Sequence, residues 1–107
     1  MSLDVHLMET SPHCVFDSNI THNLAKMAEA AGIYQACWRP EDIRITTARE
    51  LIPHLELGLE RLRFDPKRFE ALAPENGWGT YQGLVHFVVE YLSACREHPD
   101  AAIEVSR

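Results

Sequence analysis

The 107-residue sequence lacks several features that would identify a function at once. It has only three cysteines, Cys14, Cys37 and Cys95, which are widely separated and form no C-x-x-C motif. An odd number of scattered thiols argues against both a disulfide framework and a zinc site. We therefore expect reduced, mostly buried thiols.

Long apolar runs are also missing. A signal peptide needs an apolar segment of about 7–15 residues, and a membrane-spanning helix needs about 20. We therefore expect a cytoplasmic protein without a membrane partner. The Asn19-Ile20-Thr21 sequence matches a glycosylation acceptor, but this match has no meaning in a chain that is not secreted.

Basic residues are outnumbered, with 10 Lys and Arg against 16 Asp and Glu and a net charge of -6. This charge repels a phosphate backbone, and no stripe of basic residues with interleaved aromatics offsets it. We expect no nucleic-acid partner. A basic protein partner would fit the charge, although most acidic proteins are simply soluble.

Recognisable catalytic and cofactor motifs are absent as well. The six histidines do not follow the spacing of a zinc protease, and no glycine-rich phosphate loop occurs. His6, His13 and Cys14 have only a weak metal-ligand spacing, and the other two thiols lie among apolar residues, where cysteine is inert. We expect no catalytic residue, no metal and no cofactor.

Strand patterns are present at both ends of the chain. Hydrophobic residues make up 46% of the sequence and charged residues 24%, which is typical of one globular domain covering residues 1–107. Apolar and polar residues alternate over 3–8 and over 102–105, which predicts two strands. The β-branched and aromatic stretch 14–16 is a candidate third strand, after a turn at 10–12.

Helical patterns fill the region between these strands. We expect a first helix over 20–31, started by a cap among residues 17–19 and ended at Gly32. Residues 33–42 read as a packed connector with room for one more helical turn. Thr47 and Glu50 have capping-box spacing before a leucine-rich second helix, in which Pro53 either delays the start or bends the axis.

Two further helices follow. Asp65-Pro66 predicts a short helix over 67–72 that ends at Pro74. Thr80 should cap the last helix, whose apolar residues follow the i, i+3, i+4, i+7 pattern up to Cys95.

The two terminal strands need partners for their backbone groups, and pairing with each other is the simplest solution. The expected fold class is therefore α+β: a small two- or three-stranded antiparallel sheet formed by the chain ends, packed against a layer of about four helices. Such a sheet leaves an exposed edge, so strand pairing across a dimer stays open.

The stretch SNITHN, residues 18–23, is the first polar cluster that could carry a function. Asn19, Thr21, His22 and Asn23 would lie at the start of the first helix. One interpretation is structural, with Ser18 or Asn19 capping the helix and Asn23 holding a neighbouring loop. The other is a binding site of amides and a hydroxyl beside free backbone N–H groups.

The stretch NGWGTY, residues 76–81, is the second cluster. Trp78 either folds onto the core as a lid or, with Tyr81 and Asn76, stacks on a planar ligand or anchors a protein interface. If this loop packs over the start of the first helix, the two clusters form one site. Trp38, in the packed connector, is a further candidate contact.

These motifs, Asn19-x-Thr21-x-Asn23 and Asn76-Gly77-Trp78-Gly79, together with a proline-containing second helix and the ending PDAAIEVSR, resemble a group of small uncharacterised bacteriophage, prophage and bacterial proteins. The resemblance covers most of residues 4–107 and implies an accessory role without a mechanism.

The sequence thus favours a non-enzymatic binding protein, acting through protein–protein contacts or as a homo-oligomer. The alternative is a small-molecule or nucleotide binder that uses the Asn, Thr and Trp cluster. An enzymatic activity such as a metal-dependent hydrolase has the least support.

Overall fold

The computed structural model describes residues 1–9 and 13–107, so the expected turn at 10–12 lies outside the described residues. The described residues form, in order, β1 (Ser2–Met8), β2 (Cys14–Thr21), the 3-10 helix η1 (His22–Leu24), α1 (Ala25–Ala30), α2 (Tyr34–Trp38), the 3-10 helix η2 (Pro40–Ile43), α3 (Ala48–Phe64), α4 (Pro66–Glu70), α5 (Tyr81–Glu97) and β3 (Ala102–Ser106). No helix in these ranges is long and apolar enough to span a bilayer.

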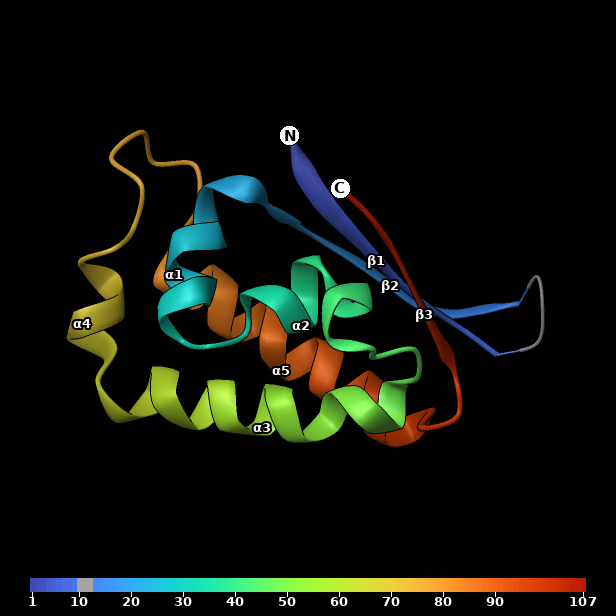
Figure 1. Cartoon of the computed structure of the whole chain (residues 1–107). Coiled ribbons are helices and arrows are strands. Elements are labelled where there is room, and N and C mark those ends of the chain that lie inside the picture. The colour runs from blue at the N-terminus through green and yellow to red at the C-terminus, as the bar shows by residue number, and fades with distance from the viewer. Residues whose placement is uncertain (10–12) are drawn as a thin grey trace.

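The three strands form one antiparallel sheet in the order β2-β1-β3. The N-terminal strand is in the centre, and the two chain ends lie side by side (Figure 1). Asp4 pairs with Asn19 on one side and with Ser106 on the other. The expected α+β class, with an antiparallel sheet made from the chain ends, is confirmed.

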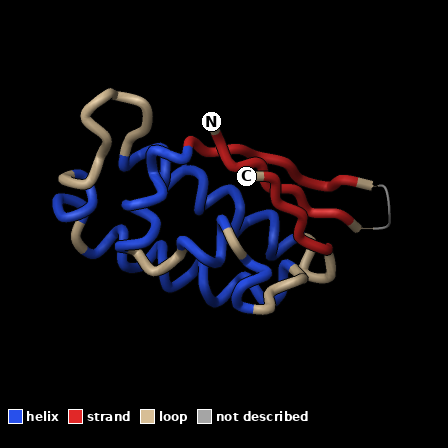
Figure 2. The backbone as a smooth tube through the Cα atoms, turned by 45° about the horizontal axis from the view of Figure 1, so that its top comes forward, coloured by secondary structure: helices blue, strands red, loops and turns tan. Residues whose placement is uncertain are grey.

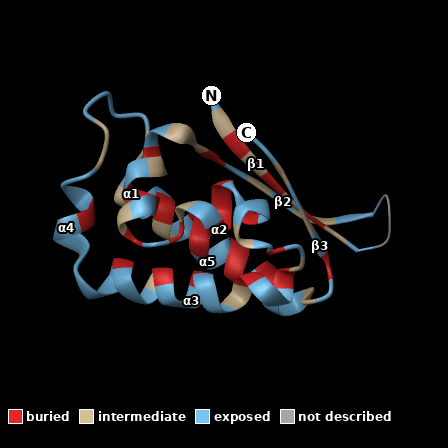
Figure 3. Ribbon diagram, in the orientation of Figure 1, coloured by how far each residue is buried: buried red, intermediate tan, exposed pale blue. Residues whose placement is uncertain are grey.

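The helices cover one face of this sheet. Leu3, Val5 and Leu7 of β1 are fully buried, because alternate residues of a strand point to the same face and here meet the helical layer. Buried residues line the boundary between the sheet and the helices, as Figure 3 shows. Polar side chains of the same strands, such as His6 and Asp17, point to the opposite face.

The start of the first helix differs from the expectation. Residues 18–21 continue strand β2 and do not begin a helix, so neither Ser18 nor Asn19 is a helix cap. Ile20 pairs with Leu3 and is buried, and this pairing with the central strand outweighs the local preference of Ser and Asn for caps. The cap is Thr21, followed by η1 and then α1.

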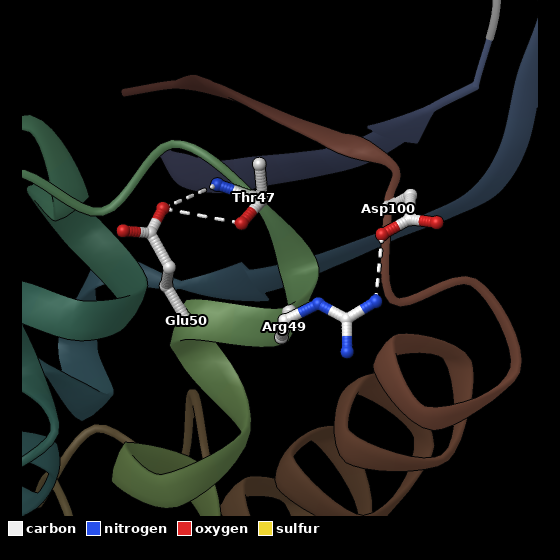
Figure 4. Close-up of polar contacts among 4 residues, drawn as sticks. All are labelled: Thr47, Arg49, Glu50 and Asp100. Carbon is white, nitrogen blue, oxygen red and sulfur yellow. Dashed lines mark hydrogen bonds and ion pairs between the residues drawn. The ribbon is translucent and has the colours of Figure 1, made fainter.

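The other predicted helices are present. Pro53 does not delay the start of α3, and the short helix expected over 67–72 spans Pro66–Glu70. The capping box of Thr47 and Glu50 is present (Figure 4). α3 begins directly after Thr47, and Pro53 lies inside the helix. Pro53 is exposed, so water can reach the carbonyl group of Arg49 that the proline leaves without a donor. Asp65 precedes α4 but makes no side-chain cap bond.

The start of α5 and the end of α1 agree with the sequence predictions. Thr80 caps α5 by accepting a hydrogen bond from the amide of Gly83 at 2.9 Å. The apolar stripe of α5 is buried from Leu84 to Cys95. Gly32 has a φ of 79°, the left-handed conformation expected just past a helix end.

Candidate functional site

The polar residues of the first cluster divide between two places. The hydroxyl of Thr21 accepts hydrogen bonds from the backbone N–H of Asn23 at 3.2 Å and from its side-chain amide at 3.1 Å. Asn19 lies on β2, exposed on the outer face of the sheet opposite Asp4. Thr21 and Asn23 therefore form a local cap, and Asn19 does not belong to it.

His22 and Trp38, which are 16 residues apart, are brought into contact. The indole Nε1–H of Trp38 donates to Nδ1 of His22 at 2.9 Å, so the proton of the neutral imidazole is on Nε2. Trp38 is only 2% exposed, and Tyr34 stacks on it with a centroid distance of 5.6 Å. The histidine satisfies a buried donor, which is a structural role.

The second cluster has one residue turned outward. The side-chain carbonyl of Asn76 accepts from the backbone N–H of Trp78 at 2.9 Å and fixes the turn. The side chain of Trp78 is 71% exposed, so the interpretation as a lid on the core is wrong. Tyr81 points inward, and its hydroxyl donates to the carbonyl of Leu62 at 2.7 Å, which joins α5 to α3.

The two helix entrances are neighbours. Gly79 lies against η1 so closely that a Cβ atom there would be 2.9 Å from Cγ of Leu24 and 3.1 Å from Cγ2 of Thr21. Its φ of 132° is also one that other residues rarely adopt. The loop before α5 therefore packs on the start of η1, although the amides of Asn23 and Asn76 are both engaged in local bonds.

Sequence reasoning missed three further exposed apolar residues. Leu57 is 47%, Phe64 90% and Leu72 40% exposed. Leu57 lies in the middle of α3, Phe64 ends this helix, and Leu72 follows α4. The end of α3, α4 and the loop before α5 lie at one end of the molecule (Figure 1). We call the four residues Leu57, Phe64, Leu72 and Trp78 the apolar end.

A signal for Leu57 and Phe64 was present in the sequence. They are seven residues apart and lie on the face of α3 opposite its buried stripe of Leu51, Leu55 and Leu62. An apolar pair on the outer face of an amphipathic helix has no partner in the core.

Basic side chains surround part of the apolar end. The segment 61–69, RLRFDPKRF, has four basic residues and one acidic residue in a chain of net charge -6. Leu57, Phe64 and Phe69 line a hollow of about 430 Å³ together with two basic and two acidic residues, Arg61, Arg68, Glu60 and Asp65. The hollow is thus apolar with charges of both signs, although the segment 61–69 itself is basic.

The outer face of the sheet has the opposite character. The register places His6 between Asp17 of β2 and Glu104 of β3, with Asp4 one pair along. Residues 1–9 and 13–107 contain no group of His, Cys, Asp or Glu side chains arranged to hold a metal ion. This face is a polar, acidic surface.

The buried thiols are unsuited to nucleophilic chemistry. Burial raises the pKa of Cys37 to about 12, with a further contribution from nearby Cys95, and burial also raises the pKa of Cys95 to about 12. Both therefore stay protonated at neutral pH. Cys14, at the start of β2, is exposed.

Comparison with known proteins gives no relative from which a function could be transferred, since no family model, curated protein or solved structure matches the chain.

Proposed function

We propose that this protein is a non-enzymatic, cytoplasmic protein-binding module that engages its partner through the apolar end. The observation that carries the proposal is Trp78, a large aromatic side chain that is 71% exposed on a turn fixed by Asn76. A partner that covers this indole would bury a large apolar area. Trp, Tyr and Arg are also the residues that contribute most at protein interfaces.

The surroundings of Phe64 support the same proposal and indicate the chemistry of the partner. Phe64 and Leu57 present apolar surface, and two basic and two acidic residues line the same hollow: Arg61, Arg68, Glu60 and Asp65. A protein segment that combines an apolar anchor with charged side chains of both signs would match these properties. In the phage or prophage setting implied by the sequence motifs, the partner would be a host or phage protein.

Affinity capture with matched variants tests this proposal. The tagged chain is compared with Trp78→Ala, Phe64→Ala and Ser106→Ala, the last being a control because Ser106 is exposed on β3 of the sheet. We expect a captured protein that is lost with the first two variants and kept with the third. Identical capture by all four chains would contradict the proposal.

A small-molecule binder is the second candidate. The amides of Asn23 and Asn76 are already engaged in local bonds, but the hollow beside Phe64 has about 430 Å³, within the usual range for ligand pockets. A ligand at a hundredfold its Kd would stabilise the fold by about 2.7 kcal/mol. Thermal-shift screening of nucleotides and metabolites tests this candidate, and a hit whose shift survives Phe64→Ala would contradict the hollow as its site.

A further inference from the structure

The outer edge of β2 presents unpaired backbone groups. In an antiparallel ladder, the backbone N–H and C=O groups of successive residues alternately point toward the neighbouring strand and away from it. The amide of His22 donates to the carbonyl of Met1 at 3.3 Å, which extends the ladder of β1 and β2. The backbone groups of Ser18 and Ile20 therefore point toward β1, and Asp17 and Asn19 direct their N–H and C=O groups outward. Thr21 directs only its N–H outward, because its carbonyl is at the N-cap of η1.

The other edge of the sheet verifies this assignment. By the same alternation, the backbone N–H and C=O groups of Ile103 in β3 should point away from β1. The amide of Ile103 does donate to the carbonyl of Thr46, with an N···O distance of 2.9 Å. The outward groups of Asp17 and Asn19 have no such backbone partner within residues 1–9 and 13–107.

The helical layer leaves this edge accessible. α5 lies beneath β2 on the inner face, where Phe16 stacks on Tyr91 with a centroid distance of 5.8 Å. It is therefore below the plane of the sheet, and Figure 2 draws no other element beyond β2 in that plane. An additional strand could extend the sheet without displacing a helix.

We propose that a second copy of this chain occupies the edge, with the two β2 strands antiparallel and Ser18 on the twofold axis. Asp17 of each copy then faces Asn19 of the other, and these two residues exchange both N–H···O bonds. On the inner face Phe16 lies opposite Ile20, an aromatic and β-branched pair that stabilises a sheet. The result is a continuous six-stranded sheet with the helices of both copies on one side.

The side chains select this register over its neighbours. A shift that places Asp17 on the axis would bring two carboxylates directly opposite each other, which is destabilising. A shift that places Asn19 on the axis would put Ser18 opposite Ile20 and Phe16 opposite His22, so the apolar pair is lost. If one strand slides by a single residue relative to the other, residues whose backbone groups point outward lie opposite residues whose groups point toward β1, and no ladder of hydrogen bonds forms.

Sedimentation velocity over about 10 µM to 1 mM protein tests the edge. Asn19→Pro removes an outward N–H that no bond within the chain uses, and Asn19→Ala keeps this N–H while removing the same side chain. We expect a concentration-dependent dimer for the parent chain and for Asn19→Ala, and at least a roughly tenfold larger dissociation constant for Asn19→Pro. Circular dichroism verifies that each variant is folded.

Disulfide cross-linking tests the register independently of the proline variant. In a Cys14→Ser background, Ser18→Cys places two thiols opposite each other in a non-hydrogen-bonded pair, with a Cα separation near 4.5 Å that permits a disulfide. Ser106→Cys adds an exposed thiol on the same sheet, away from the edge. We expect rapid oxidation to a covalent dimer for Ser18→Cys and not for Ser106→Cys.

A parent chain that remains monomeric throughout this range overturns the proposal. A dimer whose dissociation constant is unchanged by Asn19→Pro also overturns the proposal, because the contact must then lie elsewhere, for example at the apolar end. Failure of Ser18→Cys to cross-link within a proline-sensitive dimer overturns the register.

Discussion

The two edges of the sheet differ in how their backbone groups are satisfied. The edge of β3 is covered at its start by residues 46–49, which precede and begin α3. Ile103 donates to Thr46, and in the segment just before β3 the carbonyls of Ala101 and Pro99 accept from Ala48 and Arg49, with N···O distances of 2.8–2.9 Å. An ion pair between Arg49 and Asp100 lies at the same place (Figure 4). The edge of β2 has no such cover within the described residues.

The comparison shows two solutions to one problem. An unpaired strand edge is a template for association, and proteins either cover it or use it. At β3 a segment of the same chain covers the start of the edge, so this contact stabilises the monomer. In the proposed dimer a second copy covers the edge of β2, so that edge would determine the state of assembly.

The largest expected difference between the edges is in their tolerance of proline. Ile103→Pro removes the amide that donates to Thr46 and should reduce the free energy of unfolding by about 2–3 kcal/mol. Asn19→Pro should cost the monomer less than about 1 kcal/mol, because edge positions tolerate proline. Urea denaturation at low protein concentration measures both, with Ile103→Ala as the control for the lost side chain. Equal decreases in the free energy of unfolding for Ile103→Pro and Asn19→Pro would contradict this difference between the two edges.

The next largest effect on stability is expected at the hydroxyl of Tyr91, which is buried beneath β2. Tyr91 stacks on Phe16 of β2 and is fully buried, and its hydroxyl has no hydrogen-bond partner among the described residues. Burial also raises the pKa of this hydroxyl well above its ordinary value, so it stays protonated. Tyr91→Phe should therefore stabilise the fold by about 1 kcal/mol.

Tyr81→Phe is the matched control for this substitution. The hydroxyl of Tyr81 donates to Leu62 at 2.7 Å, so its removal should destabilise by about 1 kcal/mol. Thermal denaturation of both variants checks the opposite signs, and a destabilising Tyr91→Phe would contradict the account of the buried hydroxyl.

The covered edge should be sensitive to acid through Glu50. Hydrogen bonds from the amides of Thr46 and Thr47 and from their hydroxyls lower the pKa of this carboxylate below 4.5. Because the folded-state pKa is depressed, the stabilisation is present above pH 4.5 and is lost as the pH falls through the folded-state value. Glu50→Gln should lower the Tm at pH 7 and flatten its decline below pH 4.5. Glu104→Gln, at an exposed position of β3, serves as control; an unchanged acid profile in Glu50→Gln would count against the cap.

The smallest effect is expected from the ion pair at the covered edge. Arg49 and Asp100 approach to 2.7 Å, but their side chains are 65% and 88% exposed. Such pairs contribute at most about 0.5–1 kcal/mol. A double-mutant cycle with Arg49→Ala and Asp100→Ala measures the coupling, and a value well above this range would assign the closure of the edge to charge rather than to backbone bonds.

Several helix ends could be predicted from the sequence. Thr47 with Glu50, Thr80 and Gly32 are local signals in which one side chain or one backbone conformation determines a helix end, and the structure confirms each of them. Local physics decides these positions, so no knowledge of the fold was needed.

The open edge could not be predicted in the same way. Ser18 and Asn19 prefer caps and turns, yet pairing with β1 holds them in β2, and this pairing depends on residues far away in the chain. The same holds for Trp78, whose exposure depends on the path of a loop between α4 and α5. The Leu57 and Phe64 pair was detectable from its helical spacing but was not recognised.

Amide hydrogen exchange of Asn19 and Ile103 tests the account most directly. At about 10 µM protein the account predicts a protected Ile103 amide and a rapidly exchanging Asn19 amide, and at about 1 mM it predicts that Asn19 also becomes protected. An Asn19 amide as protected as Ile103 at low concentration would show that the edge of β2 is covered within one chain. Rapid exchange of Asn19 at high concentration would contradict pairing with a second copy.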